Sequence, residues 1–253
     1  MDMNGGLKQN TWFRAFLEGV VIVGSILLAF GIEAWWDRHN ERLEETSIVS
    51  GLHDQFSRHK EQLNEMIEYQ KLKVTTVQDL LLIIQQNQWE KHADRIDTLL
   101  GIALRPATMD LGDGVLESTI SSGHLDFISD QELRLKLVRW EGVLGEASDD
   151  EIVIRNIILD KIFPYLTGKG LPMGGSLEKM VSSEWPIPKR TLAGDPQKLN
   201  ALCMDPVFAA LLEELLGFTM HSGWEYQNTL QTIDEILDNL EHYEGHRVGP
   251  TNL

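Results

Sequence analysis

An uncharged apolar run near the N-terminus, residues 19–32, constrains the fold more than any other feature of this chain. A helix that spans a bilayer needs about 20 residues, so the run alone is short. Aromatic residues extend it on both sides, because Trp12 precedes it and Trp35 and Trp36 follow it. A helix from Trp12 to Trp35 rises about 35 Å, which places tryptophans near both membrane surfaces. The sequence therefore predicts a transmembrane anchor over 15–36, with these three tryptophans at the membrane interfaces.

Two other interpretations of this run remain open. In a cleaved signal peptide, Lys8 and Arg14 are the basic region and Ala29-Phe30-Gly31 is a weak cleavage motif. In a water-soluble protein, the run is a buried core helix. We expect the retained anchor, because the flanking tryptophans fit both membrane surfaces.

Basic residues beside the run bear on its orientation. Lys8 and Arg14 lie before it, and Arg38 and Arg42 follow it. The two sides therefore carry equal numbers of basic residues, and the count does not decide the orientation. A short N-terminal tail, residues 1–14, favours a signal-anchor that keeps the tail in the cytoplasm. The rest of the chain is then exported, which in a Gram-negative bacterium means into the periplasm.

The anchor also has a face of small and polar residues. Gly24 and Gly31 are seven residues apart and lie on one side of a helix, with a small or polar stripe beside them. Small residues let helices approach closely in lipid, and polar ones can hydrogen-bond across the contact. This pattern predicts a helix-association face through which the anchor binds a second copy or another membrane protein: Gly24, Ser25, Ala29, Gly31 and Glu33. Glycine is also common in membrane helices that do not associate.

Charge and cysteine content exclude several classes of function. The chain has 22 Lys+Arg and 39 Asp+Glu, for a net charge of −17, and this argues against nucleic acid as a partner. Its single cysteine, Cys203, excludes an intramolecular disulfide framework and a cysteine-rich zinc site.

Helical periodicity continues beyond the anchor. Residues 37–48 are polar nearly all round, which is typical of a helix that crosses solvent, and we interpret them as a juxtamembrane stalk. Apolar residues then recur every three or four positions as far as about residue 86, with a possible break near Thr75-Thr76. His59 and Gln70 fill two gaps in this stripe, and we expect both at its edge, in contact with solvent.

Local signals place further helices. Ser129 and Ser148 each begin a Ser-x-x-Glu capping box, and Gly145 is expected to end the helix between them. Asp205, followed by proline, begins a long closing helix. Between these helices, residues 167–204 are rich in proline and glycine and are predicted to be an irregular excursion, often a binding segment. Its candidate docking loop is Trp185, Pro186 and Pro188.

No segment has the alternating pattern of a strand. We therefore predict an all-α fold in which the transmembrane helix continues into the stalk and packs in an antiparallel helical bundle, residues 49–244. Residues 245–253 are predicted to be a flexible tail.

Two stretches together resemble a known family. Residues 27–38 end the apolar helix with Glu-Ala-Trp-Trp-Asp-Arg, and residues 122–134 read Ser-Gly-His-Leu-Asp-Phe-Ile-Ser-Asp-Gln-Glu-Leu-Arg. This is similar to a bacterial family of uncharacterised single-pass membrane proteins. Its members have a short apolar helix closed by Trp-Asp/Glu-x-Arg, and later a Ser-Gly-x-Leu-x-x-Ile-x-Asp-x-x-Leu-Arg element. The resemblance implies a bacterial membrane protein without an established activity. Together with the signal-anchor orientation, it predicts the inner (cytoplasmic) membrane as the location and a periplasmic helical body.

Motifs for catalysis are missing. No histidine follows a glutamate by three residues, as a di-iron bundle requires, and Thr167-Gly-Lys-Gly170 lacks the spacing of a phosphate loop. We therefore expect no enzyme, cofactor or metal site. The leading hypothesis is a non-enzymatic, membrane-anchored helical scaffold or accessory subunit whose partners are the lipid bilayer, itself or another membrane protein. The alternative is an exported helical sensor or ligand-binding domain that signals through a partner, which a ligand-sized pocket between helices would favour.

Overall fold

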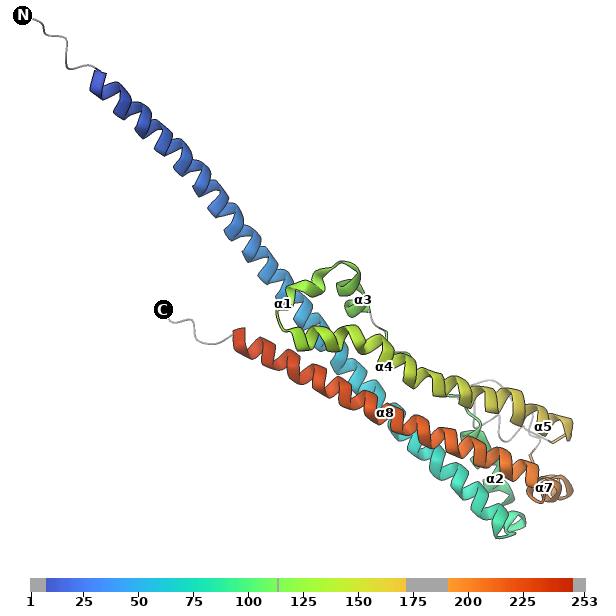
Figure 1. Cartoon of the computed structure of the whole chain (residues 1–253). Helices are drawn as coiled ribbons and strands as arrows, with labels where there is room; N and C mark the ends of the chain where they lie inside the picture. The colour runs from blue at the N-terminus through green and yellow to red at the C-terminus, as the bar shows by residue number, and fades with distance from the viewer. Residues whose placement is uncertain (1–7, 113, 172–190, 248–253) are drawn as a thin grey trace, which may run out of the picture.

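The structure is a computed structural model that describes residues 8–112, 114–171 and 191–247. Every regular element in these ranges is a helix (Figure 1). The all-α prediction is therefore confirmed for the described part of the chain.

A single helix, α1 (Lys8–Gln85), runs without a break through the predicted anchor, the stalk and the first part of the bundle. Its 78 residues span about 117 Å at about 1.5 Å per residue. The predicted break near Thr75-Thr76 is wrong. The Thr75 hydroxyl bonds back to the Lys71 carbonyl at 3.1 Å, and the Thr76 hydroxyl bonds back to the Leu72 carbonyl at 2.7 Å. Both side chains are thus satisfied inside the helix and do not interrupt it.

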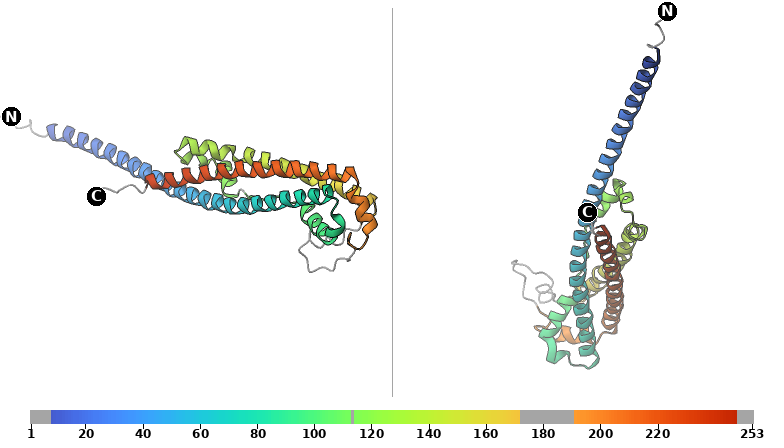
Figure 2. Two further views of the ribbon diagram at one scale, coloured as in Figure 1. Left: turned by 90° about the horizontal axis from the view of Figure 1, so that it is seen from below. Right: turned by 90° about the vertical axis from the view of Figure 1, so that its left-hand side faces the viewer.

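Two other long helices, α4 (Gln131–Asn156) and α8 (Pro206–Arg247), form the body together with the second part of α1. Helix α8 packs against both of them and runs antiparallel to both (Figures 1 and 2). The first part of α1 projects beyond the body as a bare rod. The predicted start of the closing helix is confirmed, because the Asp205 carboxylate accepts the Val207 N–H at 2.9 Å.

Shorter helices close the two ends of the body. We call the end where α1 emerges the near end and the opposite end the far end (Figure 1). The near end carries α3 (Gly114–Ser121) and the 3-10 turn η2 (His124–Phe127). The other short elements lie toward the far end: the turn η1 (Trp89–His92), α2 (Ala93–Ala103), the π-helical turn η3 (Ile157–Ile162), α5 (Phe163–Gly168) and α7 (Pro196–Cys203).

A hydrogen-bonded joint fixes the point where α1 leaves the body. The Tyr243 hydroxyl of α8 donates to the Glu45 carboxylate of α1, which is buried. The same hydroxyl accepts the Ser129 backbone N–H at 3.0 Å. Helices α1 and α8 and the segment before α4 are therefore tied together at the near end.

Helix α4 differs from the prediction at its start and in its middle. Its N-cap is Asp130, whose carboxylate accepts the N–H groups of the next turn, and not Ser129, which bonds to Tyr243 instead. Gly145 does not end the helix. Ser148 lies in the helix interior, where its hydroxyl donates to the Leu144 carbonyl at 2.8 Å, so the second capping box is wrong. Burial of the α4 face outweighs the local stop signal there.

These caps lead to a paired prediction on stability. Asp130→Ala removes a real N-cap and should lower the free energy of unfolding by about 1 kcal/mol. Ser148→Ala lies inside a helix, where alanine is the better helix former, and should change it by less than about 0.5 kcal/mol. Urea unfolding of the two variants, followed by circular dichroism, measures both values. An equal loss in the two variants would mean that α4 is in fact two helices.

Part of the predicted irregular excursion is helical. Helix α7 lies inside 167–204, with Asp195 as its N-cap and Pro196 at its first position. The Asp195 carboxylate accepts the Lys198 N–H at 3.2 Å, and the apolar face of α7 is buried at Leu199 and Leu202. The prediction missed this helix because the same proline that marks a loop also begins a helix.

Two apolar clusters fill the body. One lies toward the near end and includes Phe56, Trp140 and Tyr226, and the other lies toward the far end and includes Leu100 and Leu212. Each cluster combines residues of α1 or α2 with residues of α8, so the long helices are held along their whole shared length.

Candidate functional site

The most unusual surface of the molecule is the first part of α1. Every described side chain from Phe13 to Glu44 is exposed, and Val20, Leu27 and Leu28 show 51%, 65% and 67% of their surface. Among the described residues, α1 is the one helix long and apolar enough to cross a membrane, judged by length and composition. We call Phe13–Trp36 the bare segment. Water-soluble monomers rarely expose a continuous apolar surface of this size.

The predicted interface and association residues fall on this segment. Trp35 and Trp36 are 60% and 56% exposed, and the Trp35 ring stacks on His39 with centroids 5.6 Å apart. The backbone of Trp12 belongs to α1, while its side chain lies outside the described side chains. The association face is uncovered in this chain: Gly24, Ser25, Ala29, Gly31 and Glu33. The predicted docking loop, Trp185, Pro186 and Pro188, lies outside the described residues.

A second feature is a segment without regular secondary structure that runs back along α1. Residues 105–112, which we call the return segment, follow α2 and lead back to α3 at the near end. Tyr69 of α1 donates to the Arg105 carbonyl at 3.4 Å, and Gln55 donates to the Gly112 carbonyl at 3.3 Å. The helical rise between Gln55 and Tyr69 is about 21 Å, and seven extended residues cover about 23 Å. The return segment therefore lies antiparallel along α1.

Two buried polar side chains of α1 make hydrogen bonds to other elements, His59 to this segment and Gln70 to α8. His59 is 2% exposed and donates from Nε2 to the Gly112 carbonyl at 3.1 Å, while its ring stacks on Trp140 with centroids 5.8 Å apart. Gln70 is 3% exposed and donates to the Ser222 hydroxyl at 3.1 Å. The expectation that both residues contact solvent is wrong. An extended backbone needs hydrogen-bond partners for its carbonyls, and α1 supplies them from its buried face.

Glu151 supplies the corresponding acceptor from α4. Its carboxylate accepts the Met109 N–H at 3.0 Å and the Tyr226 hydroxyl. Burial raises the pKa of Glu151 above its ordinary value, and it raises the pKa of the Tyr226 hydroxyl as well. The sequence does carry a signal for Glu151, because the buried stripe of α4 continues to it from Leu133 in steps of three or four residues.

This burial predicts a pH dependence. Since the pKa of Glu151 is higher in the folded state than the ordinary 4.5, its ionisation costs more in the folded state. Stability should therefore fall as pH rises from 4.5 through the folded pKa, and then level off. Glu151→Gln removes this titration. The free energy of unfolding of both proteins, measured between pH 4 and pH 8, should fall more steeply in the parent than in the variant, which keeps only the declines from other groups with raised pKa values, Asp97 and His221; parallel curves would contradict it.

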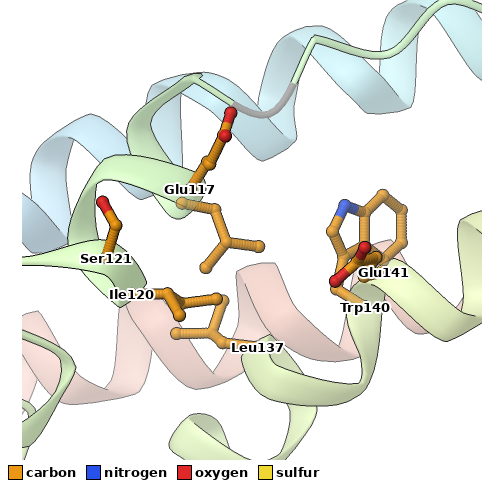
Figure 3. Close-up of a pocket in the computed structure, with 7 residues that line it drawn as sticks. Glu117, Ile120, Ser121, Leu137, Trp140 and Glu141 are labelled. Atoms are coloured by element: carbon orange, nitrogen blue, oxygen red, sulfur yellow. The ribbon is translucent and has the colours of Figure 1, made fainter. Parts of the chain in front are cut away.

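The described residues also line a cleft at the near end, between α3 and α4 (Figure 3). Its volume is about 440 Å³. Leu137 and Trp140 of α4 lie at its floor and are fully buried, whereas Ile120 of α3 is 46% exposed along its wall. Glu117 of α3 and Glu141 of α4 are its acidic groups.

One further polar pair in the described part of the chain lies between α8 and α4. His221 and Asp150 form this pair at 2.6 Å, and the hydrogen bond that the His221 ring donates to the Asp150 carboxylate raises the pKa of His221. Within the described ranges, no group of three or more His, Cys, Asp or Glu side chains is placed to hold a metal ion. In comparisons with protein-family models, curated proteins and solved structures, nothing matches this chain.

Proposed function

We propose that this chain is a non-enzymatic, membrane-anchored helical protein that serves as a scaffold or accessory subunit of a membrane protein assembly. The observation that supports this most is the continuity of α1, which carries the bare segment and the buried face of the body in one unbroken helix. With the bare segment in a bilayer, Trp36 lies at the membrane surface. Glu45, where burial begins, then lies about 14 Å beyond it. The body is held close to the membrane at a fixed distance.

Its proposed partners follow from the surfaces of α1. The bare segment binds the lipid bilayer, because its exposed apolar side chains cost free energy in water. The small face around Gly24 and Gly31 binds a second copy or another membrane protein. Apart from the helix's own backbone and the adjacent residues, no atom of the described residues lies within 4 Å of a side-chain carbon added at either glycine, so a partner helix has room to approach.

Membrane extraction of the full chain, expressed in a bacterium, tests the anchor. We expect the protein in the membrane pellet after alkaline carbonate washing, which removes peripheral proteins. Crosslinking in membranes, followed by mass measurement in detergent, should recover a dimer or a heteromeric complex. A soluble protein would contradict the anchor, and a clean monomer without a crosslinked partner would contradict the scaffold.

We further propose that the chain is a single-pass protein of the bacterial inner membrane with a periplasmic body. The resemblance of residues 122–134 supports the bacterial membrane location, and a signal-anchor orientation of the apolar run gives the periplasmic body. Cysteine labelling tests it, since the native Cys203 is buried and protected. In a Cys203→Ala background, Glu61→Cys should react with an impermeant maleimide in spheroplasts, and Asp2→Cys should react only after lysis. The opposite pattern would place the body in the cytoplasm.

The second candidate function is an exported ligand-binding or sensor domain that signals through a partner. One observation favours it, namely the cleft between α3 and α4, whose volume lies in the range of small-molecule sites. Binding of a small molecule in this cleft, with a change in the crosslinked partner, would support the sensor over the scaffold.

A further inference from the structure

The cleft between α3 and α4 has walls that are held by bonds to other elements. The first N–H groups of α3, from Val115 and Leu116, donate to the Gln55 side chain of α1 at 3.0 and 3.1 Å. Gly51 of α1 lets α3 pack closely, because a side-chain carbon there would lie 3.2 Å from Val115. At its other end, α3 is followed by Gly123, whose φ of 75° favours glycine. The cleft is therefore a preformed space, which lowers the entropy cost of binding a ligand.

The inner surface of the cleft is apolar. Leu116 and Leu137 are 3% and 0% exposed, and together with Trp140 they form a floor that is already packed. Ile120 stands above this floor on α3 and leaves almost half of its surface uncovered, facing the space between the two helices (Figure 3). Helix α3 packs mainly on α1 and η2, and this leaves the gap to α4 open. An apolar group in the cleft would cover Ile120 and gain the free energy of that burial.

Apart from the indole N–H of Trp140, the polar side-chain groups that line the cleft can accept hydrogen bonds. Glu117 and Glu141 carry carboxylates, and neither makes an ion pair or hydrogen bond with the described residues. The Ser121 hydroxyl donates its proton to the Ser118 carbonyl at 3.2 Å and keeps its oxygen lone pairs as acceptors. Among the described residues that line the cleft there is no lysine, arginine or histidine. This arrangement repels anions, and it suits a cation that carries several N–H donors.

We propose that this cleft binds a small primary amine with an apolar body. The ammonium group pairs with one of the two carboxylates at the cleft, Glu117 or Glu141, and the apolar body covers Ile120. Two acidic groups on opposite helices give the site its selectivity for a positive charge, while the apolar wall gives it selectivity for an amphipathic molecule. This site does not depend on the membrane, since all of its residues belong to the body.

Calorimetric titration of the full chain in phosphatidylcholine nanodiscs, with empty nanodiscs as the blank, tests the proposal. Three probes share one apolar body: 2-phenylethylamine, 2-phenylethanol and 3-phenylpropionate. We expect the amine to bind at least about tenfold more tightly than the alcohol, and the acid to give no measurable heat. Added salt should weaken binding of the amine, because the acidic groups are exposed.

Two matched double variants locate the site. Glu117→Gln with Glu141→Gln should reduce the affinity for the amine to that for the alcohol. Glu132→Gln with Glu146→Gln removes the same charge from α4 away from the cleft, and should leave the affinity for the amine within about twofold of the parent. Equal binding of all three probes would overturn the cation selectivity. No heat with the amine up to about 10 mM, or unchanged binding in the first variant, would overturn the site itself. A soluble chain can be titrated without nanodiscs, so failure of the anchor does not affect this test.

Discussion

Arginine at both Val23 and Leu27 will move the protein from the membrane pellet to the soluble fraction. The two side chains are 57% and 65% exposed and lie in the middle of the bare segment. Each arginine at the centre of a membrane helix costs about 2.5–3.5 kcal/mol of insertion free energy, so the pair costs about 5–7 kcal/mol. Fractionation with carbonate washing, followed by immunoblotting, measures the shift.

The control for this prediction replaces two exposed apolar residues of the body by arginine. Val138 and Ile152 are exposed apolar residues of α4, at 55% and 44%, and both face away from the buried stripe. Val138→Arg with Ile152→Arg should leave the protein in the pellet. If the bare-segment variant also resists carbonate, the bare segment is not the anchor, whereas loss of both variants from the pellet would indicate misfolding.

Truncation of Trp140 will have the largest effect on the stability of the body. The residue is fully buried, its ring meets Phe56 edge-on at 5.1 Å, and it stacks on His59. Trp140→Ala therefore opens a cavity between α1 and α4, and it should lower the free energy of unfolding by about 3–5 kcal/mol. Urea unfolding of the full chain in mild detergent, followed by circular dichroism, measures the loss through the shift in midpoint.

An exposed tryptophan provides the matched comparison. Trp36 lies on the bare segment and is 56% exposed, so Trp36→Ala removes a ring that packs on nothing in the body. Its free energy of unfolding, measured in urea, should stay within about 0.5 kcal/mol of that of the parent. A loss as large as that of Trp140→Ala would show that the bare segment is part of the folded core.

The long helices were predictable from sequence because their apolar residues repeat over many turns. Helix α1 follows this pattern at Val49, Leu52, Phe56, Leu63, Val77 and Leu81, which are buried as the periodicity predicts. It departs from the pattern at Met66, Val74 and Ile84, which are half-buried beside the buried Ile67, Lys73 and Ile83. Local stop signals were less reliable. Gly145 and Ser148 look like a helix boundary, but Ala147 and Glu151 are buried on one continuous face of α4, and packing of that face outweighs the glycine's cost of about 1 kcal/mol.

The polar contacts of the body could not be predicted from local patterns. His59 reaches Gly112 across 53 residues of sequence, and Gln55 reaches Leu116 across 61. A histidine in an apolar stripe has the same local sequence whether it faces water or a buried carbonyl. The path of the return segment decides whether His59 faces water or a buried carbonyl. A segment without regular secondary structure has no periodic sequence pattern from which its path could be predicted.

The two candidate surfaces, the bare segment and the cleft, also differ in how far the sequence predicts them. The bare segment is a local property, so the sequence sufficed to find it. The cleft combines Glu117 and Ile120 with Trp140 and Glu141, which come from two helices joined by a turn. The sequence pattern assigns Trp140 to the core, but it does not show that α3 leaves a gap beside it.

An unbroken α1 makes the molecule a lever. From Trp36 to Gln85 the helix extends about 73 Å, and no hinge lies between them. With the bare segment in a bilayer, as we propose, a change of 10° in its tilt would swing the opposite tip through about 13 Å, and membrane helices adopt tilts over a range of about 40°. Lateral pressure, bilayer thickness or the pairing of two such rods would thus be amplified into a displacement large enough to meet or release a neighbour.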